Sequence, residues 1–417
     1  MTAWFPSGRN DSVGWRFNAV GLLAVIGESS IAPHVFALTS SWLCLLPRLI
    51  PAPQAMLKPS RPTRFPAVPA NVVGVHSGTR VGELNFYADL IHQIGTLKPY
   101  EFHEYSIRRA SEYTSSVEEQ IPPAVMSMRT VSPLDILAAG SCVLTVGLLF
   151  WACLIQDGVA IIALAAMAFA SVLVGLARWH RPQLSIRPTD TVVPDGDIII
   201  RTREGAFIVV KCSEEIAREL YTGTEEAKYF IGDRVFKLVM GAGTVALMVA
   251  VVLLGNCSWT MQVAIGTAYL FLNGAYWIVA LFPKTWIWDI SPYEINETTP
   301  PGRENAHRQG TGSMIPSYTR TLWCAIQSTK QTSWIPISGA APETAAWKEW
   351  ERLAYANSVN PDWDAVGEKD RLMREFRERE YQQYGREHDF TAANNAPLLY
   401  RSVGKRCDQI HHCPTKH

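Results

Sequence analysis

The chain has 417 residues, and its 38 lysines and arginines are balanced by 38 aspartates and glutamates, so the formal net charge is zero. No region is strongly basic, which argues against a nucleic-acid-binding surface. Eight cysteines are too few for a disulfide scaffold in a chain of this length. The hydrophobic content of 48% is an average over a very apolar middle and polar ends. The apolar middle excludes a soluble cytosolic protein.

The start of the chain, residues 1–32, has arginines before a short apolar stretch, as a signal peptide does. Asn18 interrupts the apolar stretch, and Pro33 directly follows the small residues at 30 and 32 that could form a cleavage site. We therefore expect that no signal peptide is cleaved; the alternative is a cleaved signal peptide. Residues 31–50 are a weak candidate for a fifth span or an interfacial segment. Prolines and Arg48 interrupt this segment, which favours the view that it does not span.

Residues 51–69 carry six prolines and predict an extended linker. Further along, the apolar spacing over 80–95 predicts a short amphipathic helix, and 105–120 is a second helical candidate. Together, residues 1–133 are expected to form a cytosolic N-terminal region.

Four long apolar runs occupy 134–155, 158–177, 238–255 and 259–282. A bilayer core needs about 20 apolar residues of helix, and a helix satisfies its own backbone there. Asp135 follows a Ser-Pro pair and reads as part of a helix cap rather than a proton site. The runs predict an α-helical integral membrane protein with four transmembrane helices, arranged as hairpins at 134–177 and 238–282.

The charges around these runs predict the topology. The hairpin connections, at 156–157 and 256–258, contain no lysine or arginine. The opposite ends carry Arg129, Arg178, Arg181, Arg234, Lys237 and Lys284. Because positive charge stays in the cytosol, both termini and the central loop are expected to be cytosolic. Glycosylation of the Asn296 sequon would contradict this multi-pass topology.

The loop at 178–237 has two β-rich runs joined by a hairpin signal and then a helix start at Ser213. It predicts a small cytosolic ββα unit. The tail at 283–417 is expected to be cytosolic and largely irregular, with helices near 343–356 and 364–384.

Few residues suggest chemistry. Cys407, His411, His412 and Cys413 could in principle bind a metal, but their spacing matches no common zinc site, so an unstructured tail is favoured. Asp195-Gly196-Asp197 is a D-x-D pattern that reads as a turn before a strand. We therefore predict no catalytic, cofactor-binding or metal residue and no cofactor.

The runs have no charge near their centres, which argues against ion-coupled transport. Small residues such as Gly175 and Gly243 favour a compact bundle instead. We predict a non-catalytic scaffold or interaction protein that binds the lipid bilayer, and cytosolic proteins through 178–237 and 343–384. The alternatives are a channel or transporter subunit, which a polar cavity around Gln262 and Asn273 would favour, and a membrane-embedded lipid-modifying enzyme.

One resemblance adds to this reading. Ser-Pro-Leu-Asp at 132–135, Asp-Gly-Asp-Ile-Ile-Ile-Arg-Thr-Arg-Glu-Gly-Ala-Phe at 195–207, Glu-Leu-Tyr-Thr-Gly-Thr-Glu-Glu at 219–226 and Ala-Tyr-Trp at 275–277 resemble an uncharacterised group of multi-pass membrane proteins from filamentous fungi. The similarity covers roughly residues 100–295. It implies a membrane architecture and a fungal origin, and no site residues.

Overall fold

A computed structural model describes residues 31–110, 128–129, 131–184, 194–303 and 317–382. The chain divides into two compact units. The large unit comprises Met1–Leu97, Tyr105–Thr202 and Val210–Glu297. The small unit comprises Lys98–Glu104, Arg203–Val209 and Thr298–His417.

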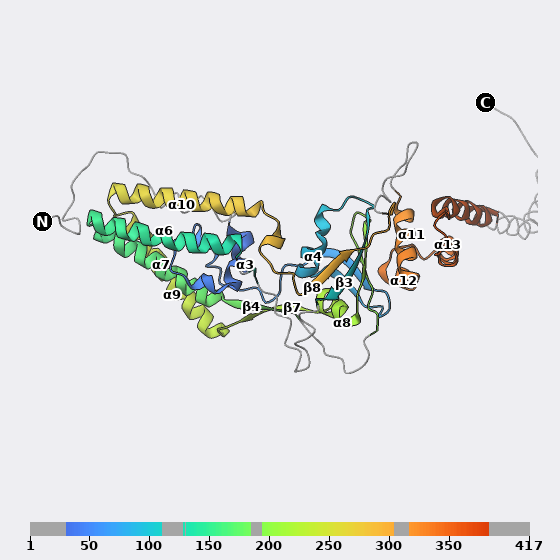
Figure 1. The fold of residues 1–417 in the computed structure, drawn as a ribbon, viewed down its shortest axis with the longest axis horizontal. Coiled ribbons are helices and arrows are strands. Elements are labelled where there is room, and N and C mark those ends of the chain that lie inside the picture. The colour runs from blue at the N-terminus through green and yellow to red at the C-terminus, as the bar shows by residue number, and fades with distance from the viewer. Residues whose placement is uncertain (1–30, 111–127, 130, 185–193, 304–316, 383–417) are drawn as a thin grey trace, which may run out of the picture. The chain divides into compact units, whose positions relative to one another are not determined.

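Four helices in the large unit are long and apolar enough to cross a membrane: α6 (Pro133–Ile155), α7 (Gly158–Arg178), α9 (Asp233–Leu254) and α10 (Trp259–Ala280). They lie side by side in Figure 1. The predicted cap is present, because the backbone N–H of Asp135 donates to Ser132 Oγ over 3.1 Å. The prediction of four helices with the length and apolarity of membrane spans is confirmed.

The polar part of the chain contains a six-stranded mixed sheet, with a parallel pair at its centre. Its order is β2-β1-β5-β6-β3-β8. The strands are β1 (Val68–Gly74), β2 (Arg80–Leu84), β3 (Phe102–Arg109), β5 (Ile198–Arg201), β6 (Phe207–Lys211) and β8 (Tyr293–Glu297). Strands β4 (His180–Leu184) and β7 (Glu225–Tyr229) form a separate antiparallel pair.

This sheet shows that the predicted fold class was wrong. The protein is not an all-helical membrane protein with a small ββα loop, because its fold is mixed α/β. Strands β5 and β6 do form in the loop, but they lie in the middle of a larger sheet. After β6 the chain forms α8 (Glu214–Ile216), which continues into the π-helical turn η5 (Ala217–Thr222).

Of the two helices predicted before α6, the first forms over part of its range and the second does not form in the described residues. Residues 80–95 begin with the strand β2, and the predicted short helix is α4 (Phe86–His92). The described part of 105–120 belongs to β3, which pairs with β8 at Ile107 and Ile295. The partner of β3 lies far away in the chain, and pairing over such a distance overrides a weak local helical spacing.

Residues 31–50 form three short helices, η1 (Ala32–His34), α3 (Val35–Ser40) and η2 (Trp42–Leu45). The proline-rich stretch that follows contains η3 (Pro53–Ala55). Arg178 holds this stretch, because its guanidinium donates to the carbonyl oxygens of Met56, Lys58 and Ser60 over 2.6, 2.7 and 3.1 Å.

The small unit contains α11 (Tyr318–Thr329), α12 (Trp334–Ser338), α13 (Ala345–Ala356) and helical residues 365–382. The prediction that the start of the tail is irregular was wrong, because α11 is a mostly buried helix. Its serines and threonines are poor helix formers, so packing stabilises it rather than propensity. Ser328 Oγ donates to Glu104 Oε2 over 2.7 Å, which ties α11 to β3 within this unit.

Candidate functional site

The irregular backbone between η2 and η3 lies among the four apolar helices. The N–H of Leu49 donates to Thr145 Oγ1 over 2.8 Å, and its carbonyl oxygen accepts from Ser141 Oγ over 2.9 Å. The carbonyl oxygen of Ile50 accepts from the Tyr269 hydroxyl over 2.8 Å. Non-helical backbone inside a membrane bundle needs such partners. Polar side chains of the spans therefore hold this segment.

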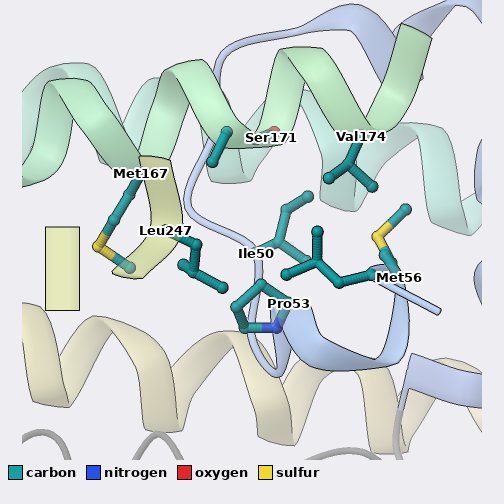
Figure 2. A pocket seen from close by; sticks show the side chains of 9 residues that line it. Ile50, Pro53, Met56, Met167, Ser171, Val174 and Leu247 are labelled. Atoms are coloured by element: carbon teal, nitrogen blue, oxygen red, sulfur yellow. The ribbon is translucent and has the colours of Figure 1, made fainter. Parts of the chain in front are cut away.

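Figure 2 shows a small cavity beside this backbone, lined by residues of the buried stretch, α7 and α9. Its lining includes Ile50, Pro53, Met56, Met167, Val174 and Leu247. The volume is about 20 Å³, enough for a single water molecule. Because the lining is mostly apolar, we interpret the cavity as a packing gap and not as a ligand site.

A charged side chain, that of Arg48, lies next to this buried backbone. Arg48 is only 1% exposed. Its Nε and Nη1 atoms are buried and have no hydrogen-bond partner among the described residues. His34 is also buried, and its ring centroid lies 6.3 Å from that of Tyr276. Arg48 was not predicted as an interior charge, because it lies outside the four long apolar runs, in a segment that was not expected to span. Interior charges are costly and often functional in membrane proteins.

A second group of buried polar side chains joins the sheet to η5. Glu219 is 2% exposed, and its Oε2 lies 2.6 Å from Arg109 Nη2. Its Oε1 accepts from the Tyr293 hydroxyl over 2.6 Å. Burial and the Glu219 charge raise the pKa of Tyr293, which keeps that hydroxyl a donor. A π-helical turn often marks a functional site, but these three side chains bind one another, so they stabilise the fold.

Glu225 caps the first turn of α4. Its carboxylate accepts from the backbone N–H groups of Phe86 and Tyr87 over 2.9 and 3.0 Å. Burial raises the pKa of Glu225 to about 7, although the two N–H groups lower it. This carboxyl therefore titrates near neutral pH within the fold.

The D-x-D pattern does not form the predicted turn, because it pairs with the chain at Cys212 and Ser213. The N–H of Gly196 donates to the carbonyl oxygen of Cys212 over 2.8 Å, and Asp195 forms an isolated bridge with Ser213. Burial raises the pKa of Asp197, whose carboxylate lies 3.8 Å from His76 Nε2. Among the residues that the structure describes, no group of three potential metal ligands occurs.

The predicted tail candidates Cys407, His411, His412 and Cys413 lie outside the described residues. The same holds for nearly all of the signal-peptide candidate at 1–32.

Gln262 and Asn273 do not share a cavity. Gln262 donates to the carbonyl oxygens of Gly255 and Cys257 over 3.3 and 3.0 Å, at the hairpin connection. Asn273 is buried eleven positions later on α10, about 16 Å along the helix axis. The polar cavity that would favour a channel is therefore not formed by these two residues.

The bundle has an open groove of about 850 Å³ between α6 and α10. Its lining is mostly apolar and includes Val143, Leu144, Leu148, Trp151, Val263 and Phe271. Such a surface is compatible with lipid chains, which are as apolar as these side chains.

The small unit has a cleft of about 440 Å³ on one side of α11. Arg320, Trp323, Cys324 and Gln327 line it from the helix, and Arg303 and Trp363 line it from the neighbouring segments. This volume lies within the range of small-molecule sites. It is the most polar of the three cavities described here.

Comparison of the chain with known protein families, curated proteins and solved structures finds no match.

Proposed function

We propose that this protein is a membrane-anchored interaction protein. Its four apolar helices hold it in the bilayer, and its polar segments bind cytosolic protein partners. The observation that carries the proposal is the six-stranded sheet. It takes β1, β2 and β3 from before α6, β5 and β6 from between α7 and α9, and β8 from after α10.

Hydrogen-bonded strands must lie on the same side of a membrane. Val72 pairs with Ile200, and Ile107 pairs with Ile295, so segments on both sides of each helical hairpin meet in one sheet. Two hairpins that each return the chain to its starting side satisfy this requirement. The membrane segments then act as an anchor for a folded polar body.

The charges support a cytosolic location of this body. The hairpin connections carry no lysine or arginine, whereas Arg129, Arg178 and Lys284 lie at the opposite helix ends. This distribution follows the positive-inside rule and supports cytosolic termini.

Exposed apolar side chains in the small unit support partner binding. Tyr355 at the end of α13 is 57% exposed, and Val359 just after it is 77% exposed. Exposed apolar groups on a polar surface can mark protein contacts.

The test is co-purification from native membranes in mild detergent, with partners identified by mass spectrometry. We expect a set of partner proteins to co-purify with the wild type. Fewer of these partners, or smaller amounts of them, are expected to co-purify with the double variant Tyr355→Ser/Val359→Ser. Arg352→Gln, a charge change at an exposed position on α13, is the control and is expected to retain the set. Thermal melting checks that all three proteins are folded. If lipid or solute but no partner protein co-purifies with the wild type, the proposal fails.

A second candidate function, transport of an anion through the bundle, is favoured by Arg48. A buried guanidinium with unpaired N–H groups attracts anions. Anion flux into liposomes that contain the purified protein tests this function. Flux that is lost in Arg48→Gln would favour it over the interaction role, and no flux above empty liposomes would exclude it.

A further inference from the structure

The cleft in the small unit is lined along one face of α11. Arg320, Trp323, Cys324 and Gln327 follow one another at spacings of three, one and three residues, which places them on one side of a helix. Arg303 and the segment at 361–366 form the other walls.

Two guanidinium groups converge on this cleft. Burial raises the pKa of the Cys324 thiol to about 11, and the charges of Arg303 and Arg320 both act against this rise. Both arginines line the cleft together with Cys324. Within the described ranges neither forms an ion pair, in contrast to Arg352, which pairs with Glu349 over 2.7 Å.

The acidic residues of the cleft do not neutralise these arginines directly. Asp364 Oδ1 accepts from the backbone N–H of Gly367 over 2.9 Å, so this carboxylate caps the helix at 365–382. Asp362 is exposed. Arg320 Nη1 is buried without a hydrogen-bond partner in the part of the chain that the structure describes. A buried N–H donor without an acceptor is costly, so an acceptor that reached this guanidinium would stabilise it.

Indole rings form the apolar side of the cleft. The rings of Trp323 and Trp363 meet edge to face, with centroids 4.9 Å apart at 72°. Trp350 lies behind them, and its Nε1 donates to the carbonyl oxygen of Ala365 over 2.8 Å. This bond fixes the wall, so a planar ring that enters the cleft meets a preorganised aromatic surface.

We propose that this cleft binds a small ligand in which an oxyanion, a phosphate or carboxylate, is attached to a planar ring. The arginines hold the oxyanion through charge-assisted hydrogen bonds, for which the flat guanidinium is suited. The ring packs against Trp323 and Trp363. This proposal does not rest on the proposed partner binding through Tyr355 and Val359.

The test is isothermal titration calorimetry on the full chain in detergent, with phenyl phosphate as the probe. We expect saturable binding that weakens about tenfold or more in Arg320→Gln, the loss typical of a hydrogen bond to a charged group. Arg303→Gln is the second variant, and it is also expected to weaken binding. It is needed because Arg320 is partly buried, so that its replacement can also affect folding. Arg352→Gln is the matched control and is expected to leave the dissociation constant within about twofold.

Three further probes separate the parts of the proposal. Benzoate in place of phenyl phosphate distinguishes a carboxylate from a phosphate as the preferred oxyanion, and either preference supports the proposal. Inorganic phosphate that binds as tightly as phenyl phosphate would overturn the role of the ring. Benzyl alcohol that binds as tightly would overturn the role of the oxyanion. An absence of saturable binding by both phenyl phosphate and benzoate, or equal affinity in folded Arg320→Gln and Arg303→Gln, would overturn the site.

Discussion

Glu219 and Arg109 form an ion pair that joins the π-helical turn η5 to strand β3, with 2.6 Å between Oε2 and Nη2. Glu219 is almost fully buried, whereas Arg109 is partly exposed. The Tyr293 hydroxyl donates a hydrogen bond to the other carboxylate oxygen of Glu219 over 2.6 Å. One carboxylate therefore links the turn to two strands, β3 and β8, that are neighbours in the sheet.

Replacing this carboxylate is expected to destabilise the large unit. Glu219→Ala leaves the Arg109 guanidinium and the buried Tyr293 hydroxyl without their acceptor, a loss of about 3 kcal/mol in the free energy of unfolding. The measurement is thermal unfolding in detergent, followed by tryptophan fluorescence. Glu215→Ala, in the adjacent helix α8, is the control. Equal melting temperatures for the two variants would show that the pair does not support the fold.

The stability of the fold is expected to depend on pH through Glu225. The folded pKa of about 7 lies above the usual value of 4.5, so the folded state binds the proton more tightly than the unfolded state. Stability is then highest at low pH, falls between about pH 4.5 and 7, and does not change further above that range. A shift of this size corresponds to at most about 3 kcal/mol.

Glu225→Gln tests this dependence because it removes the titration and keeps one carbonyl acceptor for the first turn of α4. We expect the wild-type melting temperature to fall from pH 5 to pH 8 by more than that of the variant. If both proteins show the same pH dependence, another group is responsible.

The close approach of η2 to α7 requires a glycine. A Cβ atom added at Gly175 would lie 2.0 Å from the carbonyl oxygen of Cys44, which is backbone and cannot rotate away. Gly175→Ala is therefore expected to displace η2 and to lower the free energy of unfolding by about 1–3 kcal/mol. Gly147→Ala on α6 is the matched control, because a Cβ there meets nothing within 4 Å.

In the control, replacing glycine by alanine inside a helix is expected to be neutral or to stabilise by up to about 1 kcal/mol. Melting temperatures of both variants in detergent give the comparison. A Gly175→Ala protein that is as stable as Gly147→Ala would contradict the close approach.

These contacts show which parts of the fold can be predicted from the sequence. The start of α6 was predictable, because the cap at Ser132 and the long apolar run are local signals. Strand β3 was not, because its pairing with β8 joins Ile107 to Ile295 across all four apolar helices. Short polar strands of this kind carry little local periodicity.

The candidate sites were less predictable than the spans. Arg48 lies in a segment that looks too interrupted to be buried, and the contacts of Leu49 with α6 and of Ile50 with α10 bring it among the helices. The cleft of the small unit depends on α11, whose serines and threonines suggested irregular structure. In both cases tertiary packing overrides a weak local preference.

The topology gives the last prediction. Asn256 is exposed at the connection between α9 and α10, and Val359 is exposed in the small unit. If the sheet and the tail are cytosolic, these positions lie on opposite sides of the membrane. In sealed vesicles with the cytosolic side inward, a membrane-impermeant maleimide is expected to label Asn256→Cys but not Val359→Cys, in a background without other accessible cysteines. Detergent is the control, because it should make both positions reactive. Labelling of Val359→Cys in the sealed vesicles, or glycosylation at Asn296, would contradict the topology, because Asn296 pairs with Ser106 in the same sheet.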